Sequence, residues 1–179
     1  MTSESALVVL VPEAEPLVGT FRERFDPSAA AGLGAHITLL YPFVEPEAIG
    51  ESTLDALTEC FAGFAPIAFR LTAIRRFPDE TLYLAPDPDE PFRKLTLAIW
   101  QRFPDRPPYG GAYPDVVPHL SVGRFATASE RERTADELAR NRQTPLPLRA
   151  HAATAVLIAN TTGRWQVERT FTLGAETGA

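Results

Sequence analysis

Cysteine is almost absent from this chain, since Cys60 is the only one among 179 residues. A disulfide framework is therefore excluded, and the single thiol is typical of a reducing cytoplasm, where we expect the protein to act. No apolar run approaches the roughly 18 residues that a membrane helix needs, so no membrane partner is expected. Residues 2–5 are polar or acidic and the apolar run after them is short, which is not typical of a secretory signal.

Lysine is nearly absent as well, and the common nucleotide-binding motifs are missing. Lys94 is the only lysine beside 16 arginines, and the formal net charge is −6. A chain this acidic does not attract a long polyanion as a whole, so any nucleic-acid chemistry is expected at an RNA end or on a small nucleotide. Neither a P-loop nor a G-x-G-x-x-G fingerprint occurs, and no His or Cys cluster has metal-ligand spacing. We therefore expect no cofactor and no metal.

The chain has the composition of a folded protein and contains an internal repeat. Hydrophobic residues make up 45% and charged residues 22% of the sequence, which excludes disorder as the main state. Residues 6–43 carry a strand, acids, an amphipathic stretch, a loop and a strand with a histidine, and residues 81–125 repeat that order. His36 and His119, at matching places, lie 83 residues apart (119 − 36). The order of elements indicates a duplication.

Periodicity predicts the same kinds of element in both halves. Apolar residues at helical spacing predict helices, and β-branched or aromatic runs predict strands. The predicted helices span residues 17–25, 54–64, 92–103 and 127–142, and the predicted strands span residues 6–11, 35–43, 67–77, 81–85, 119–125, 146–160 and 164–173. The fold class is α+β, a bilobed duplicated fold of two mostly antiparallel sheets that flank a central cleft, with helices outside. We predict one domain over residues 1–179, with lobe-forming halves at approximately 1–80 and 81–179.

Two of the three histidines stand in matching motifs. His36 precedes Thr38 by two residues and His119 precedes Ser121 by two, so in a strand each pair lies on one face, about 6.6 Å apart. Phosphodiester chemistry uses such a pair twice, because one imidazole removes a proton, the other donates one, and hydroxyls hold the non-bridging oxygens. If a twofold axis relates the halves, both motifs meet at the seam and flank one phosphate.

A single H-x-[ST] motif carries little information, since a histidine and a threonine in a strand are commonly structural. Two copies at equivalent places of a repeat, which use two of only three histidines, favour catalysis. His151 is the internal control, because it lies in a predicted strand but is followed at the second position by Ala153, which has no hydroxyl. We interpret His151 as structural.

The segments HITLLYPF, residues 36–43, and PHLSVGR, residues 118–124, resemble the paired motifs of the two-histidine phosphoesterase superfamily, the 2′-5′ RNA ligase-like proteins. The resemblance includes the duplicated order of elements and so covers nearly the whole chain. It implies a bilobed α+β fold and metal-free opening of 2′,3′-cyclic phosphates or related nucleotide cyclic phosphates, with reversible 2′-5′ joining in some members. It also implies roles for four residues. The acid/base pair would be His36 and His119, and the phosphate-binding hydroxyls would be those of Thr38 and Ser121.

Further candidates follow the two motifs. Arg124 stands five residues after His119, where RNA-acting members of this family often carry an arginine, so the resemblance implies a phosphate contact. Under strict strand alternation Arg124 points away from His119 and reaches the cleft only if the strand twists or bulges; the alternative is a surface ion pair. Aromatic side chains could stack on a base or line the cleft rim, or else pack internally, and these are Tyr41, Phe43, Tyr109 and Tyr113.

The predicted function is a metal-independent cyclic phosphodiesterase that opens a 2′,3′-cyclic phosphate of an RNA end or a small nucleotide. One alternative enzyme acts on an ADP-ribose-type cyclic phosphate. A second alternative is a nucleotide-binding module without turnover, although binding alone does not require two titratable groups. A third is a structural domain, which predicts separate surroundings for the two histidines. No obligate protein partner is evident, and we expect a monomer.

Overall fold

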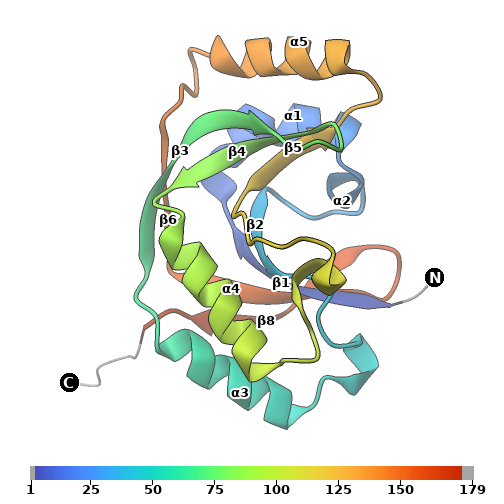
Figure 1. The fold of residues 1–179 in the computed structure, drawn as a ribbon, viewed down its shortest axis with the longest axis vertical. Helices are drawn as coiled ribbons and strands as arrows, with labels where there is room; N and C mark the ends of the chain where they lie inside the picture. The colour runs from blue at the N-terminus through green and yellow to red at the C-terminus, as the bar shows by residue number, and fades with distance from the viewer. Residues whose placement is uncertain (1–2, 175–179) are drawn as a thin grey trace.

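The computed structural model describes residues 3–174, which form one curled sheet of eight antiparallel strands in the order β6-β3-β4-β5-β2-β1-β7-β8 (Figure 1). The strands are β1 (Glu4–Leu10), β2 (His36–Leu40), β3 (Ile67–Arg76), β4 (Thr81–Asp87), β5 (Leu120–Arg124), β6 (Leu148–Ala152), β7 (Thr154–Asn160) and β8 (Trp165–Thr172). The helices are α1 (Glu15–Phe25), α2 (Pro27–Ala30), α3 (Glu51–Ala62), α4 (Glu90–Arg102) and α5 (Ala128–Ala139), with short 3-10 turns η1 (Pro12–Ala14), η2 (Pro46–Ala48) and η3 (Pro108–Gly111).

The α+β class and the antiparallel pairing are confirmed, but the prediction of two sheets is wrong. Ile37 of β2 pairs with Leu120 of β5, and this contact joins the two sets of strands into a single sheet. Periodicity along one strand shows which face is apolar, yet it contains no information about which strand lies alongside. The sequence pattern therefore could not distinguish one curled sheet from two separate ones.

The predicted elements differ from the observed ones mainly at their ends. Thr127 caps α5 as expected, since its hydroxyl accepts a hydrogen bond from the Glu130 amide at 3.2 Å. The strand predicted over residues 146–160 is divided near Ala153, because β6 pairs with β3 whereas β7 pairs with β1. The closing hairpin of β7 and β8 is confirmed.

The main core lies between the helices and one face of the sheet. Buried side chains of β2 and β5 on that face include Ile37 and Leu120, both 0% exposed. Helix α1 packs on β5, and α4 packs on β2. Helices α1 and α5 lie toward one end of the molecule, and α3 and α4 toward the other (Figure 1).

The two halves of the chain interlock in the sheet. Ile37 and Leu120, which occupy equivalent places one after each motif histidine, pair with each other as a twofold axis requires. Strand β3 pairs with β4, and β7 pairs with β1, so the later strands of each half lie beside the first strand of the other half. The division of the single domain near residue 80 stays a prediction.

Within the described part of the chain, residues 3–174, none of the helices has the length and hydropathy that a membrane span requires.

Candidate active site

The four motif side chains gather where β2 meets β5. Ile37 and Leu120 point into the core, so the residues on either side of them point to the opposite face, which we call the histidine face. The antiparallel register sets His36 beside Ser121 and Thr38 beside His119, and opposed Cα atoms in such strands lie roughly 4.5–5.5 Å apart. Each imidazole therefore has the hydroxyl of the other motif as its cross-strand neighbour.

Both imidazoles are held by the same local hydrogen bond. Nδ1 of His36 lies 2.8 Å from the carbonyl oxygen of Gly34, and Nδ1 of His119 lies 2.7 Å from that of Val117. A carbonyl only accepts, so Nδ1 carries the hydrogen in each ring and donates it. Nε2 is then the nitrogen left to exchange a proton with a substrate in both histidines.

Electrostatics separates the two rings. Burial lowers the pKa of His36 to about 4, more than the Gly34 carbonyl raises it. The charges of Arg22 and His119 also lower it, and the Asp26 carboxylate raises it. Burial also lowers the pKa of His119, but the Val117 carbonyl and the Asp79 carboxylate oppose that effect. His36 is therefore neutral near pH 7. Each ring has one acidic side chain that favours its proton, but neighbouring positive charges oppose that effect only at His36.

Matching β-bulges follow the two motifs. Between the pairs Leu7–Leu40 and Val8–Thr38, β2 has one residue more than β1, and that residue is Leu39. Between the pairs Leu82–Gly123 and Tyr83–Ser121, β5 has one residue more than β4, and that residue is Val122. Leu39 and Val122 stand at the same place in the repeat, three residues after each histidine.

The bulge in β5 decides where Arg124 points. Arg124 pairs with Thr81, which lies two residues before Tyr83 in β4, and Tyr83 pairs with Ser121. Arg124 thus shares the histidine face with Ser121, because the extra residue reverses the alternation. Its Nε donates a hydrogen bond to the Asp79 carbonyl oxygen at 3.2 Å, beside His119. Tyr41, at the equivalent place after the bulge in β2, is on the same face.

Sequence reasoning missed an aromatic group beside His119. Phe77 stacks on Tyr83 with ring centroids 4.1 Å apart and meets the His119 ring edge-on at 4.9 Å. Phe77 and Asp79 belong to the turn between β3 and β4, so the chain order gives no hint of their neighbour in β5. Tyr83 could have been found, since it alternates with the core residues Leu82 and Leu84.

The surroundings of His36 are more apolar. Val8 pairs with Thr38 on the histidine face and belongs to a small buried cluster with Leu33, against which Tyr41 and Trp165 pack. The Tyr41 and Trp165 rings meet edge-on at 6.5 Å. Burial, with the Glu4 carboxylate nearby, raises the pKa of the Tyr41 hydroxyl. Tyr41 therefore lines the face but is partly engaged in packing.

The loop before β5 contributes the rim. The Tyr109 amide donates to the Tyr41 carbonyl oxygen at 2.6 Å, and its hydroxyl lies close to Thr38. Burial raises the pKa of Tyr109 to about 12, so the phenol is protonated. Tyr109 has a φ of 52°, which is a costly left-handed conformation for a residue with a side chain. Tyr113 is 62% exposed and touches the Tyr109 ring edge-on.

Two predicted residues lie elsewhere. Phe43 is 2% exposed and packs edge-on against Phe103 in the core, so of its two alternatives internal packing is the one observed. It comes two residues after Tyr41, where the chain has left β2 and alternation no longer applies. His151 lies exposed on β6, an edge strand, away from β2 and β5.

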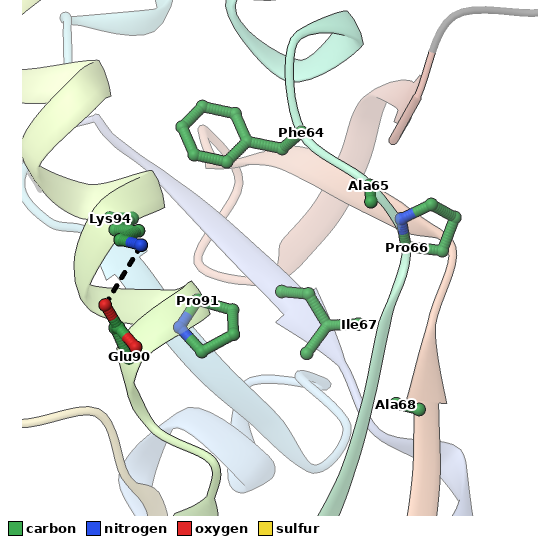
Figure 2. Close-up of a pocket in the computed structure, with 8 residues that line it drawn as sticks. All are labelled: Phe64, Ala65, Pro66, Ile67, Ala68, Glu90, Pro91 and Lys94. Carbon is green, nitrogen blue, oxygen red and sulfur yellow. Dashed lines mark ion pairs between the residues drawn. The ribbon is translucent and has the colours of Figure 1, made fainter.

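Neither a metal site nor the hollow drawn in Figure 2 coincides with the motif residues. Among residues 3–174, no group of three His, Cys, Asp or Glu side chains is arranged to hold a metal ion. Figure 2 shows a hollow between the start of β3 and the first turn of α4, with the Glu90–Lys94 ion pair of 2.9 Å on its α4 side. No motif residue lines it, and its walls are largely Phe64, Pro66, Ile67 and Pro91.

The fold and the paired motifs define a duplicated α+β protein of the phosphoesterase or ligase type. The chain belongs to the 2′-5′ RNA ligase superfamily, whose family model matches residues 10–163 and so includes both motifs.

Solved structures of this superfamily share the fold. LigT of E. coli complexed with 3′-AMP has a TM-score of 0.63 at 14% identity, covering 98% of this chain and 100% of LigT. LigT complexed with NADP+ has a TM-score of 0.59 at 14% identity, with 97% and 99% coverage. TT0787 of Thermus thermophilus has a TM-score of 0.58 at 14% identity, again with 97% and 99% coverage. No curated protein matches the chain.

Proposed function

We propose that this protein opens a 2′,3′-cyclic phosphate, at an RNA end or on a small nucleotide, by acid/base catalysis with His36 and His119. One observation carries the proposal. Two imidazoles with the same Nδ1 hydrogen bond and two hydroxyls surround the single Ile37–Leu120 pair on one face of the sheet. A structural role for the histidines would not require them to share one surface.

The proposed reaction is a hydrolysis in one displacement. Nε2 of one imidazole takes a proton from water while the water oxygen bonds to phosphorus. The bond from phosphorus to one ribose oxygen breaks, and Nε2–H of the other imidazole protonates that oxygen. The product is a phosphomonoester. Thr38 and Ser121 donate hydrogen bonds to the non-bridging oxygens, where negative charge is concentrated.

The pKa values favour one assignment of the two histidines. His36, with a pKa of about 4, is neutral near pH 7 and suits the base. His119 has the Asp79 carboxylate nearby to favour its protonated form and suits the acid. An anionic phosphate between the rings adds further negative charge and favours the proton on His119. With a second RNA hydroxyl in place of water as the attacking group, the same displacement would form a 2′-5′ linkage, and its reverse would cleave that linkage.

Positive charge on the histidine face supports a nucleotide substrate despite the net charge of −6. Arg124 lies on this face in β5, and Arg75 pairs with Tyr83, so Arg75 extends the same row onto β3. Arg75 is exposed and makes no ion pair within residues 3–174. We assign Arg124 to the reacting phosphate and Arg75 to a further phosphate, with Phe77 as a stacking surface for a base. LigT structures hold 3′-AMP, ATP and NADP+, which agrees with a nucleotide-sized ligand.

The experiment presents three substrates in the presence of EDTA: a 2′,3′-cyclic mononucleotide, an RNA that ends in a cyclic phosphate, and an ADP-ribose cyclic phosphate. Phosphorus NMR identifies the phosphomonoester formed. We expect turnover of one of the first two, unchanged by chelation. If EDTA abolishes turnover and a divalent ion restores it, the mechanism is wrong. Exclusive turnover of the third substrate favours the ADP-ribose alternative, and binding without turnover of all three favours the binding module.

Arg75 distinguishes an RNA end from a mononucleotide. Arg75→Gln should lower kcat/KM several-fold on the RNA, because one charged hydrogen bond to phosphate is lost, and leave the mononucleotide unaffected. Arg140→Gln is the matched control, because Arg140 is an exposed arginine directly after α5 and pairs with Asp136. An equal loss on both substrates contradicts the assignment of Arg75 to a further phosphate.

A further inference from the structure

Two arginines contact the chain just before the two motif histidines, and they use the same atoms to do so. In α1, Nε and Nη2 of Arg22 donate to Oδ2 of Asp26 at 3.1 and 3.0 Å, while Nη1 donates to the Leu33 carbonyl oxygen at 3.0 Å. In α4, Nε and Nη2 of Arg93 donate to Oδ2 of Asp89 at 2.9 and 2.8 Å, while Nη1 donates to the Val116 carbonyl oxygen.

The two carbonyl groups occupy the same place relative to the histidines. Leu33 lies three residues before His36, and Val116 lies three residues before His119. The next carbonyl along the chain is in each case the one that accepts the hydrogen of Nδ1, from Gly34 or Val117. Each guanidinium thus holds the peptide adjacent to the group that orients the imidazole.

Neither arginine contacts the histidine face through a motif residue, so the acid/base proposal alone does not explain them. Their carboxylate partners lie on opposite sides in sequence, since Asp26 follows Arg22 by four residues and Asp89 precedes Arg93 by four. Helices α1 and α4 come from different halves of the chain. The same three-bond arrangement therefore recurs although the local sequences that form it differ.

We infer that Arg22 and Arg93 are positioning residues, each of which holds the carbonyl group that fixes the Nδ1–H form and the orientation of one motif histidine. This inference rests on the proposed function only for its effect on turnover. The planar guanidinium can hold a carboxylate with two nitrogens and a carbonyl with the third, which a lysine ammonium cannot do in the same plane. A displacement of the ring by about 1 Å would cost on the order of 10²-fold in rate.

Arg93 is the better residue to change. Its side chain is 39% exposed, whereas that of Arg22 is 2% exposed and also reaches the Ser28 hydroxyl at 3.0 Å. Loss of Arg22 would leave Asp26 without its buried partner and could unfold the chain. The test therefore compares Arg93→Met and Arg93→Lys with Arg102→Met. Arg102 is on the same helix and pairs with Glu59 at 3.4 Å.

The first measurement does not depend on activity. Long-range proton–nitrogen NMR of the imidazoles, recorded near pH 8, shows which ring nitrogen carries the hydrogen. We expect Arg93→Met to give a mixture of the two neutral forms at His119 and to leave His36 in the Nδ1–H form. Arg22→Lys should have the reciprocal effect on His36. Thermal unfolding of each variant verifies that the chain is folded.

The second measurement is turnover. Arg93→Met should lower kcat on the order of 10²-fold with KM within about threefold, Arg93→Lys should recover part of that loss, and Arg102→Met should equal the wild type. A His119 ring that stays in the Nδ1–H form in folded Arg93→Met overturns the inference. If the ring changes form but the wild type turns over none of the three cyclic phosphates, the inference stands and the proposed function fails.

Discussion

The surroundings of His36 and of His119 share a backbone framework but differ in charge. Each ring is tethered through Nδ1 to the carbonyl two residues earlier, and each strand bulges three residues after its histidine. Around His36 the neighbours are apolar residues and the opposed charges of Arg22 and Asp26, whereas around His119 they are Phe77, Tyr83 and the Asp79 carboxylate. The two regions share what orients the imidazoles and differ in what sets their affinity for a proton.

There is a physical reason why the two regions share their backbone geometry but differ in their electrostatics. The orientation of each imidazole depends on the backbone around it. A twofold arrangement can repeat that backbone even where the side chains on the neighbouring strands differ. Unequal electrostatics favours a reaction that needs one neutral and one protonated imidazole, because it decides which of the two rings holds the proton. Four predictions test whether the two regions are alike in geometry and unlike in charge.

The largest effects should come from the histidines themselves. His36→Ala and His119→Ala should each lower kcat/KM on the order of 10²–10⁴-fold, and the double variant should lose less than the product of the two. On a 4-nitrophenyl phosphodiester, whose leaving group needs no proton, His119→Ala should recover most of its activity and His36→Ala should not.

His151→Ala is the control for this comparison and should retain wild-type rates, since His151 lies on an edge strand. Recovery of His36→Ala rather than His119→Ala would reverse the assignment of acid and base. Full activity of either motif variant on the natural substrate would contradict the proposed function.

The two hydroxyls should matter less than the histidines. Thr38→Val and Ser121→Ala should each lower kcat about 10–100-fold, since each removes one hydrogen bond to a charged oxygen and no proton transfer. Tyr109→Phe removes the hydroxyl that lies close to Thr38, and it should affect the enzyme less than Thr38→Val. Steady-state kinetics of all three variants tests the order, and a Ser121→Ala enzyme as slow as His119→Ala would contradict it.

Stability should distinguish the two bulges. An added Cβ at Gly123 would lie 2.5 Å from Cβ of Phe25 on α1, so Gly123→Ala should cost about 1–3 kcal/mol in free energy of unfolding. The equivalent place in β2 is occupied by Leu40, whose side chain is buried, so the structure accommodates a side chain at that position of β2. Gly50→Ala is the control, because nothing lies within 4 Å of its added Cβ. Urea unfolding measures both variants, and equal midpoints would show that the close approach to α1 is unimportant.

The smallest effect should be a shift of one limb of the pH profile. The free enzyme is active only when His36 is neutral and His119 is protonated. His36 is neutral above its pKa of about 4, and His119 is protonated below its own pKa, which burial lowers. The profile of kcat/KM should therefore peak on the acidic side of 6.5, the ordinary histidine pKa. Asp79→Asn removes a charge that raises the pKa of His119, so the alkaline limb should move to lower pH while the acidic limb stays.

Asn at position 79 can still accept the Thr81 amide hydrogen bond of 3.2 Å, so the turn is preserved. If the acidic limb of the profile moves instead, the assignment is reversed, and His119 is the histidine that must be neutral.

The sequence by itself determined the repeat, the kinds of element and the four motif residues. These follow from local patterns, since alternation in a strand sets His36 and Thr38 on one face whatever lies beside them. The Thr127 cap and the β7–β8 hairpin are local in the same sense. The family resemblance added the expectation that Arg124 contacts a phosphate, but it did not indicate the bulge through which Arg124 reaches the histidine face.

Only the tertiary structure decided the rest. Strand pairing across the seam made one sheet of an expected two, and the extra residue Val122 turned Arg124 toward His119. Phe77 and Asp79 reach His119 from a turn more than 35 residues earlier, and Arg22 and Arg93 reach their carbonyl groups from helices. Pairing register, bulges and contacts of this kind depend on which segments become neighbours, and a periodic pattern along one segment carries no record of its neighbour.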